Sequence, residues 1–436
     1  MQFPKGISMT STIISAIHAR QLLDSRGRPT LEAEVSLASG DSGRASVPSG
    51  ASTGKAEAVE LRDGGHAWGG LGVAQAVDNV RKLIAPSLIG MDASDQSKLD
   101  SMMREMDGTP NLGRLGGNAI LAVSLAAVRA SAAVGRQPLY RRFAELAGAE
   151  PAMPLPMVNI LSGGLHAGRG MDVQDFLVMP VGAGSYGEAL QWVCRVRDAA
   201  GRICAERGLP TLLADEGGLS PGFATSFEAL DLMLRSFEAA GLRAGEDVAI
   251  AIDVASSSLV DEDGAYVFGR EGRSYSSAGM IGLQKEWISR YPVISIEDGL
   301  GEDDWDNWPE MTRQLGRIQL VGDDLFATRP DRIRRGIESG AANAALIKVN
   351  QNGTVSGTLD AIRTAREAGY ATVISARSGE TEDDYLADLA VGTAGGQIKV
   401  GSVRTSERMA KYNQLLRIEE AGLPWAGTSA IGPFGR

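Results

Sequence analysis

The sequence has few cysteines, few histidines and no long apolar run. It holds 2 Cys and 3 His in 436 residues, too few for a disulfide-dense scaffold. Cys194 and Cys204 match no metal or redox spacing, so we expect reduced thiols in the core of a cytoplasmic protein. No run of eighteen apolar residues occurs, so no membrane span is expected. Residues 1–11 lack the apolar centre of a secretory signal and are expected to form a flexible lead-in.

Basic residues do not outnumber acidic ones. The chain has 43 Lys and Arg against 54 Asp and Glu, giving a formal net charge of −11. Nucleic-acid-binding proteins usually carry a basic stripe, so the balance argues against nucleic acid as a partner. An anionic substrate remains compatible with it, because a metal or a local Lys/Arg cluster can reverse the local field.

The first third of the chain has strand periodicity followed by helical periodicity. Apolar and polar residues alternate as in half-buried strands over Thr12–Ala19, Thr30–Ala38 and Gly43–Val47. From about Val73 to Gly148 the period becomes helical, and Asn118–Val134 is apolar enough to be buried. Strands followed by helices predict an N-terminal α+β domain over residues 12–148.

Beyond residue 149 the pattern changes to repeated short apolar runs, each followed by a helical stretch. The runs are Val248–Ile252, Val293–Ile296, Ile318–Gly322, Ala344–Ile347 and Ala371–Ser375. Repeated strand-plus-helix units predict a parallel sheet closed as an α/β barrel over residues 149–436. Functional groups in such barrels sit at the C-terminal ends of the strands, where charged residues follow these runs.

Three carboxylates follow three of these runs. Asp253, Glu297 and Asp323 should converge at the mouth of the barrel, where like charges repel unless a cation lies among them. An all-oxygen ligand set favours magnesium over zinc or copper. Side chains alternate along a strand, so Asp298 and Asp324 should point elsewhere. The alternative is that the carboxylates pair with Arg or Lys on loops.

A lysine and a pair of acidic residues are candidates for moving protons. Lys348 ends an apolar run near the predicted metal, where its pKa could be lowered enough for it to act as a base. The alternative is a lysine that pairs with one of the carboxylates. Asp215 and Glu216 lie at a strand end in ADEGG, where a carboxyl group could deliver a proton to a leaving hydroxide, or the segment could be a plain turn.

Two further segments suit anions. Arg377 and Ser378 pair a guanidinium fork with a hydroxyl, which suits a phosphate. Lys399 ends another short run and could hold a carboxylate. The alternative for both is surface pairing with loop carboxylates. His166 lies in a glycine-rich loop after the predicted strand Pro156–Leu161, and we expect it to be functional.

The loop Pro48–Gly54 (PSGASTG) offers hydroxyls and flexible backbone, as an active-site lid needs. It is not a nucleotide-binding P-loop. Ser49 stands where that motif has its first glycine, and Ala56 follows Lys55 in place of Ser or Thr.

From Leu22 to about Glu420 the sequence resembles the enolases. The matching segments are LLDSRGRPTLEAEV, VPSGASTGKAEAVELRDG, LGGNAILAVSLA, ADEGG, SIEDGL, LVGDDLFAT, LIKVNQ, RSGETED and MAKYNQLLRIEE. The resemblance implies an N-terminal α+β domain on a barrel whose second strand is antiparallel. It also implies magnesium-dependent, reversible dehydration of 2-phosphoglycerate to phosphoenolpyruvate in glycolysis. A Lys or His base with one or two magnesium ions is a known feature of this superfamily.

The resemblance assigns roles to individual residues. Its metal ligands fall on Asp253, Glu297, Asp323 and, for a second magnesium, Ser52; its base falls on Lys348 and its acid on Glu216; its substrate contacts fall on His166, Gln174, Arg377, Ser378 and Lys399. It further implies two magnesium ions per site, a homodimer or a larger ring, and a cytoplasmic enzyme, with some bacterial relatives also found at the cell surface.

The chain departs from the family pattern at four places. Ala376 replaces a histidine, Asp175 replaces a glutamate, Ser162 replaces an asparagine, and a proline-asparagine loop ends in Gly222. Asp175 is one methylene shorter than glutamate, and catalytic geometry tolerates little displacement. We expect Asp175 to be catalytic nonetheless. Two alternatives to an enolase remain: a paralogue with changed partner chemistry, such as a carboxyphosphonoenolpyruvate synthase of phosphonate antibiotic pathways, and a non-catalytic binding protein.

Overall fold

The N-terminal unit is a three-stranded sheet backed by helices. The computed structural model describes residues 11–51 and 54–435; the expected lead-in falls almost wholly outside these ranges. The antiparallel sheet has the order β1-β2-β3, with bounds β1 (Ile14–Leu23), β2 (Pro29–Leu37) and β3 (Ser42–Ser46). The helices that follow are η1 (Ala67–Gly70), α1 (Ala74–Asn79), η2 (Val80–Ile84), α2 (Ala85–Leu88), α3 (Gln96–Asp107), α4 (Gly117–Val134) and α5 (Leu139–Ala147). The strands-then-helices expectation for this part of the chain is confirmed.

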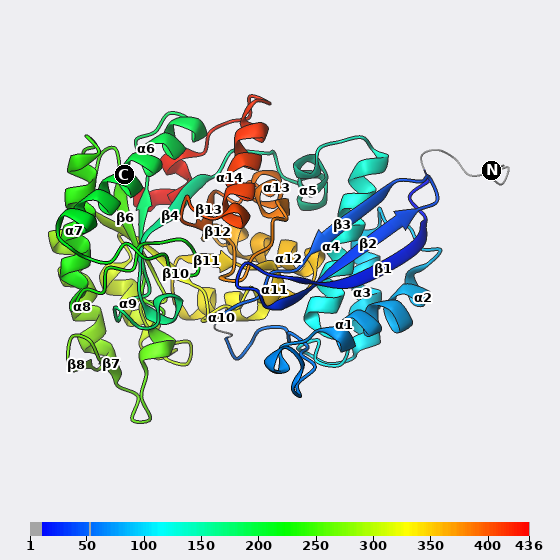
Figure 1. Cartoon of the computed structure of the whole chain (residues 1–436), viewed down its shortest axis with the longest axis horizontal. Coiled ribbons are helices and arrows are strands. Elements are labelled where there is room, and N and C mark those ends of the chain that lie inside the picture. The colour runs from blue at the N-terminus through cyan, green and yellow to red at the C-terminus, as the bar shows by residue number, and fades with distance from the viewer. Residues whose placement is uncertain (1–10, 52–53, 436) are drawn as a thin grey trace.

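Helix α4 forms the core of the N-terminal unit. By length and composition alone it could cross a membrane, but 83% of it is buried within the protein, as in a core helix of a globular domain. It packs closely against β3: a Cβ on Gly43 would meet the Ala130 backbone nitrogen at 2.2 Å. Each fully buried Leu or Val side chain contributes about 1.5–3 kcal/mol to such packing. Figure 1 shows α4 lying against the sheet.

The rest of the chain forms a closed barrel of eight strands. The strands are β4 (Leu155–Ser162), β5 (Asp175–Met179), β6 (Ala249–Asp253), β9 (Val293–Glu297), β10 (Gln319–Gly322), β11 (Ala344–Ile347), β12 (Ala371–Ser375) and β13 (Gln397–Gly401). Strand β5 is antiparallel to both neighbours, β4 and β6, and every other pair is parallel. Only the short segment 163–174 joins β4 to β5, and an antiparallel pair needs no crossover helix. The antiparallel second strand is confirmed.

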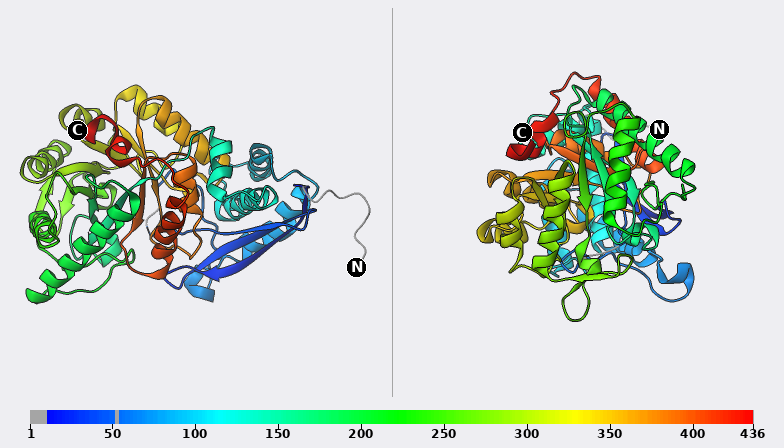
Figure 2. Two further views of the ribbon diagram at one scale, coloured as in Figure 1. Left: turned by 90° about the horizontal axis from the view of Figure 1, so that it is seen from above. Right: turned by 90° about the vertical axis from the view of Figure 1, so that its left-hand side faces the viewer.

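Helices surround the barrel, and the N-terminal unit extends from one side of it (Figure 2). The barrel helices are α6 (Tyr186–Glu206), α7 (Ser226–Ala239), α8 (Ser277–Arg290), α9 (Trp308–Leu315), α10 (Pro330–Ser339), α11 (Val349–Asn352), α12 (Val355–Glu367), α13 (Tyr385–Gly392) and α14 (Ser406–Glu419). Short 3₁₀ segments are η3 (Gly164–Ala167), η4 (Ser256–Leu259) and η5 (Gly427–Gly435), and a small hairpin is made by β7 (Tyr266–Phe268) and β8 (Arg273–Tyr275).

One expectation about the core is wrong. Cys204 is buried, but Cys194 is exposed. Both lie on α6, and ten residues of helix at roughly 100° each turn the second side chain about 80° away from the first. Only one of the two is therefore buried.

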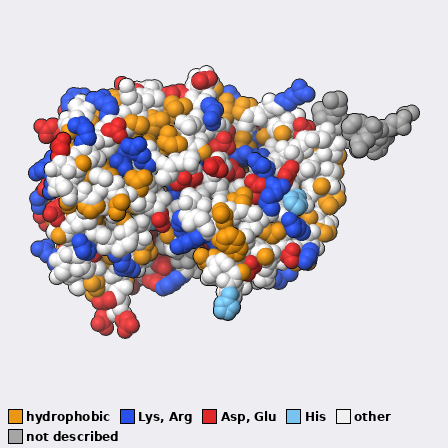
Figure 3. Space-filling view, viewed as in Figure 1, with side chains coloured by type: hydrophobic (Ala, Val, Ile, Leu, Met, Phe, Trp, Pro, Cys, Tyr) orange, Lys and Arg blue, Asp and Glu red, His pale blue; other side chains and the backbone are white. Residues whose placement is uncertain are grey.

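The visible surface carries no basic stripe. On the face shown in Figure 3, Lys and Arg side chains are interspersed with Asp and Glu. This mixture agrees with the net charge of −11.

Candidate active site

The carboxyl ends of the barrel strands gather charged residues around one small cavity. It is lined by Ala51, His166, Gln174, Glu216, Asp253, Ala255, Asp298, Asp323, Asp324, Lys348, Ser375, Ala376, Arg377, Ser378 and Lys399. Two predicted residues, Asp175 and Glu297, do not line the cavity and are buried at 0% and 2% exposure. Ser52 lies outside the described residues, while Ala51 places the preceding part of its loop at the cavity.

Lys399 joins two of the predicted metal ligands. Its Nζ donates to Asp253 Oδ2 at 2.8 Å and to Glu297 Oε2 at 2.6 Å. Burial lowers the pKa of Lys399, but the two carboxylates outweigh it and raise the pKa well above its usual value. Lys399 is therefore a buried cation among strand-end carboxylates, and the alternative of a surface lysine on a loop carboxylate is wrong.

Lys348 pairs with the third predicted ligand. Its Nζ lies 2.5 Å from Asp323 Oδ2, and Gln351 Nε2 donates to the other Asp323 oxygen at 3.0 Å. The sequence argument expected a lowered lysine pKa. Burial does act in that direction, but Asp323 outweighs it and the pKa of Lys348 is raised. The interpretation of a lysine paired with a carboxylate is confirmed, the expected lowering of its pKa is wrong, and the role of Lys348 as the base stays a prediction.

The donor set fits a hard divalent cation. Burial, reinforced by Asp253, raises the pKa of Glu297 well above its ordinary range, and its buried Oε1 atom has no hydrogen-bond partner in the described part of the chain. In general, two carboxylate charges about 4 Å apart repel each other by roughly 4 kcal/mol at an effective dielectric constant of 20. An oxygen-binding cation such as Mg²⁺ would relieve both the repulsion and the unsatisfied atom.

Asp298 and Asp324 are nearer the site than strand alternation predicted. Oxygen atoms of Asp298, Asp323 and Asp324 lie within 4.8 Å of one another. The Asp298 carboxylate accepts the backbone N–H groups of Asp323 and Asp324, both at 2.9 Å. Asp298 has φ +41°, outside the strand region, so the alternation ends at Glu297. The turn that follows brings its side chain back to the cavity.

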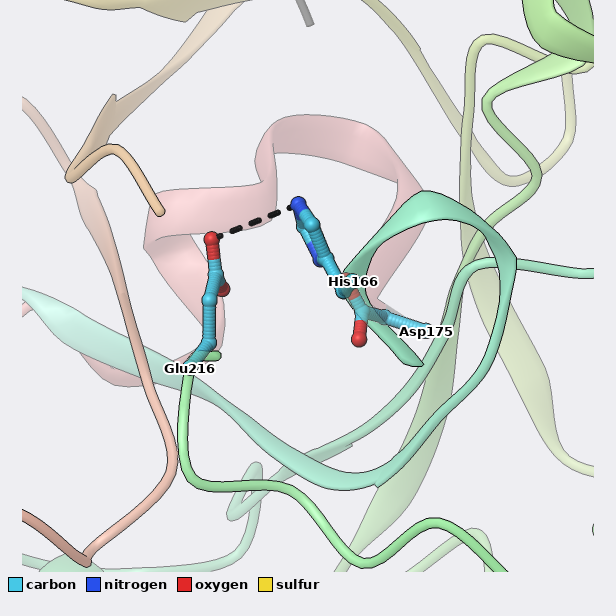
Figure 4. A group of neighbouring side chains, drawn as sticks. All are labelled: His166, Asp175 and Glu216. Carbon is cyan, nitrogen blue, oxygen red and sulfur yellow. Dashed lines mark hydrogen bonds and ion pairs between the residues drawn. The ribbon is translucent and has the colours of Figure 1, made fainter. Parts of the chain in front are cut away.

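A second cluster at the same cavity contains the predicted acid. His166 Nδ1 lies 3.0 Å from Asp175 Oδ2, and Nε2 lies 3.7 Å from Glu216 Oε1. Figure 4 shows the imidazole between the two carboxylates. Burial lowers the pKa of His166, but Glu216 and Asp175 outweigh it and raise the pKa to about 9. At neutral pH the ring is a cation between two acids.

The same cluster changes the expected roles of its carboxylates. Burial raises the pKa of Glu216, but His166 and other cations outweigh it and lower the pKa. Asp175 is fully buried, and burial raises its pKa. Ser162 Oγ donates to Asp175 Oδ1 at 2.6 Å. Two of the departures from the family pattern, Ser162 and Asp175, therefore contact each other and together orient His166.

The predicted phosphate grip connects the two domains. Arg377 Nη1 donates to Glu57 Oε2 and to Asn350 Oδ1, both at 2.9 Å. Ser378 Oγ accepts from Arg26 Nη1 at 3.2 Å. Sequence reasoning missed Glu57, and no local signal could have found it, since its partner lies 320 positions away.

These features define a class: a mixed α/β-barrel protein whose strand ends gather carboxylates and lysines around one cavity. Family models agree. The model "Enolase, C-terminal TIM barrel domain" matches residues 150–429, and "Enolase, N-terminal domain" matches residues 14–143. The chain is 51% identical over 427 residues to an enolase of Acidothermus cellulolyticus, covering 97% of this chain and 98% of that protein.

The chain therefore belongs to the enolase family. Its activity is that of a phosphopyruvate hydratase, a lyase of glycolysis that interconverts 2-phosphoglycerate and phosphoenolpyruvate. The altered paralogue and the non-catalytic binding protein are not favoured by this degree of identity. Enolases depend on magnesium, which agrees with the acidic groups at the cavity.

Proposed function

We propose that the two clusters divide the dehydration between them. Lys348 takes the proton from the carbon beside the substrate carboxylate, and Lys399 binds that carboxylate. The contact that carries this proposal is Lys348 Nζ on Asp323, at the same cavity where Lys399 bridges Asp253 and Glu297. The electron pair left on carbon is delocalised into the carboxylate and then expels the neighbouring hydroxide.

The metal ligands in this scheme are Asp253, Glu297 and Asp323, with Ser52 reaching a second ion when substrate is bound. A divalent cation held there would neutralise the carboxylates that raise the pKa of Lys348 and would stabilise charge developing on the substrate carboxylate. The unpartnered Glu297 Oε1 atom supports this assignment.

The His166–Glu216 pair supplies the proton that leaves with hydroxide. Glu216 is the acid in this scheme, yet its lowered pKa favours the carboxylate, while the neighbouring His166 carries a proton with a pKa near 9. The Nε2 atom of His166, which carries a proton in the charged ring, lies 3.7 Å from Glu216 Oε1. The two residues can therefore hold one proton between them and release it to the departing oxygen. Asp175 acts on the reaction through His166.

The remaining contacts hold the substrate. Arg377 and Ser378 bind its phosphate, and Gln174 and His166 contact its other end. Gln174 supports this role because its Oε1 atom is buried without a hydrogen-bond partner in the described residues, while Nε2 donates to Asp253. Ala376 lines the cavity but offers no polar atom there beyond its backbone.

The proposal extends to organisation and location. A domain boundary between residues 148 and 149 separates the α+β unit from the barrel. We also propose a homodimer or larger ring in the cytoplasm, which the family commonly forms; presence at the cell surface or secretion without a signal peptide remains part of the proposal.

Glu297→Gln tests the metal assignment. Turnover, followed by ultraviolet absorbance as phosphoenolpyruvate forms, should fall at least about 100-fold, because a ligand charge is lost. Calorimetric titration should show one Mg²⁺ without substrate and two with it in the native protein. Ser52→Ala should weaken only the substrate-dependent ion. Glu310→Gln, a matched change on the surface of α9, should alter neither quantity. Normal Mg²⁺ affinity in Glu297→Gln would contradict the assignment.

A further inference from the structure

Two fully buried cations lie behind the phosphate grip, on a helix that the scheme above does not use. Arg408 and Lys411 are three residues apart on α14, and both are 0% exposed. A buried charge is unfavourable unless hydrogen bonds or ion pairs satisfy it. The groups that satisfy these two cations therefore indicate which part of the fold depends on them.

Arg408 holds the phosphate-grip segment by its backbone. Its Nη1 donates to the carbonyl oxygens of Arg377 at 2.6 Å and Val400 at 3.1 Å, and Nη2 donates to the Ser378 carbonyl at 2.6 Å. One guanidinium thus ties both grip residues to strand β13. The planar fork is essential to this arrangement, because a lysine has a single nitrogen and cannot reach three carbonyls in the same geometry.

Lys411 holds the other end of the same segment. Its Nζ donates to the Thr381 carbonyl at 2.6 Å and lies 2.9 Å from Glu380 Oε2. Glu380 in turn accepts the backbone N–H of Arg377 at 3.0 Å through Oε1. The peptide groups on both sides of Arg377 are therefore fixed, one through Glu380 and Lys411 and the other by Arg408.

The Arg408 side chain has little freedom to relax. Gly401 lies beside it at φ +110°, and a Cβ at that position would meet Arg408 Cδ at 3.2 Å. Close packing of this kind transmits a change in one side chain to its neighbours. A substitution at position 408 should thus be felt at the grip residues it contacts.

We propose that Arg408 is a positioning residue that sets the Arg377–Ser378 grip for the substrate phosphate, with Lys411 as its second anchor. This proposal rests on the proposed function, in which Arg377 and Ser378 bind that phosphate. Arg408 acts on the segment's backbone, and among the described residues its guanidinium donates to none of the proposed metal ligands.

Arg408→Lys is the direct test, because it keeps the charge and removes the fork. The KM for 2-phosphoglycerate and the inhibition constant of inorganic phosphate should both rise about tenfold or more, while kcat changes less than threefold and Mg²⁺ affinity is unchanged. Arg417→Lys, the same change at an exposed position of α14, should alter none of these.

Lys411→Gln should raise the same two constants by about threefold or more. It serves as the second variant if Arg408→Lys does not fold.

Arg377→Lys separates this proposal from the one beneath it. If that variant leaves phosphate inhibition unchanged, the proposed phosphate grip is wrong. If it weakens inhibition and Arg408→Lys does not, the positioning role is wrong. In the Arg377→Lys, Arg408→Lys double variant, the inhibition constant of inorganic phosphate should rise by less than the product of the two single effects, because Arg408 acts through Arg377 and Ser378. Fully multiplied effects would also overturn the positioning role.

Discussion

The two clusters at the cavity differ in what holds them and in how they balance charge. Asp253, Glu297 and Lys399 lie at the ends of β6 and β9 and within β13, and direct ion pairs join them. His166 and Glu216 lie in η3 and in a turn instead. In the strand-borne cluster a lysine joins the two carboxylates, whereas in the loop-borne cluster the cation between the carboxylates is an imidazole, which carries its charge only below a pKa of about 9.

Two of the departures from the family pattern, Ser162 and Asp175, fall beside His166, at the facing ends of β4 and β5. Ser162 and Asp175 contact each other there, and Ala376 faces the same cavity. Both Ser162 and Asp175 belong to barrel strands, and each is the hydrogen-bonding partner of the other, so the two changes fall on one contact. The comparison teaches that amino-acid substitution is tolerated where the side chains involved contact each other directly.

The largest expected effect is on the strand-borne side. Lys348→Met should lower kcat by on the order of 10⁴, because the general base is lost. Exchange of the substrate carbon-bound proton with deuterated water, followed by NMR, should be lost to the same degree. Lys285→Met, at an exposed position of α8, is the control. Preserved exchange in Lys348→Met would mean that another group abstracts the proton.

Glu216→Gln should separate the contributions of the two clusters to the reaction. We expect dehydration to fall by on the order of 10²–10³, because the leaving oxygen loses its acid. Proton exchange at carbon should persist, since the strand-borne cluster is untouched. The measurement pairs phosphoenolpyruvate absorbance with deuterium exchange on the same sample. Equal loss of both reactions would show that the clusters do not act separately.

The third prediction concerns pH. With only 3 His in the chain, NMR titration should resolve one imidazole with a pKa near 9, that of His166. The folded pKa exceeds the unfolded value of about 6.5. The ring's contribution to stability is thus fully present below pH about 6.5 and is lost as pH rises through about 9.

Asp175→Asn is the matched variant for this titration, because it removes one of the carboxylates that raise the pKa of His166. The pKa should fall, and the loss of stability should move to lower pH. A pKa near 6.5 for the imidazole of His166 in the native protein would contradict the charged state assigned to it.

The smallest effect is expected for Ser162→Ala. Its loss leaves Asp175 Oδ1 without a buried donor, which should cost about 1–3 kcal/mol of unfolding free energy and less than about tenfold in kcat. Denaturant unfolding provides the measurement. Ser289→Ala removes a hydroxyl that donates only to the Glu286 carbonyl at an exposed position of α8, and it should change stability by less than about 0.5 kcal/mol. An unchanged denaturant midpoint for Ser162→Ala would show that the hydrogen bond from Ser162 to Asp175 does not contribute to the free energy of unfolding.

Much of the barrel could be predicted from the sequence. Apolar runs of four or five residues followed by a charge place Asp253, Glu297 and Lys348 at strand ends, because the period of a strand fixes which side chains are buried. Asp298 could not be placed in this way, because a positive φ interrupts that period directly after Glu297.

The sequence by itself determined the strands, the burial of α4 and the residue types at the barrel mouth, since these follow from local periodicity. The tertiary structure decided how those residues are charged and paired. Glu57 meets Arg377 across the domains, Asp323 raises the pKa of Lys348, and Arg408 reaches the grip residues from another helix. Such pairings depend on distances between segments far apart in the chain, and electrostatic interactions depend steeply on those distances and on burial.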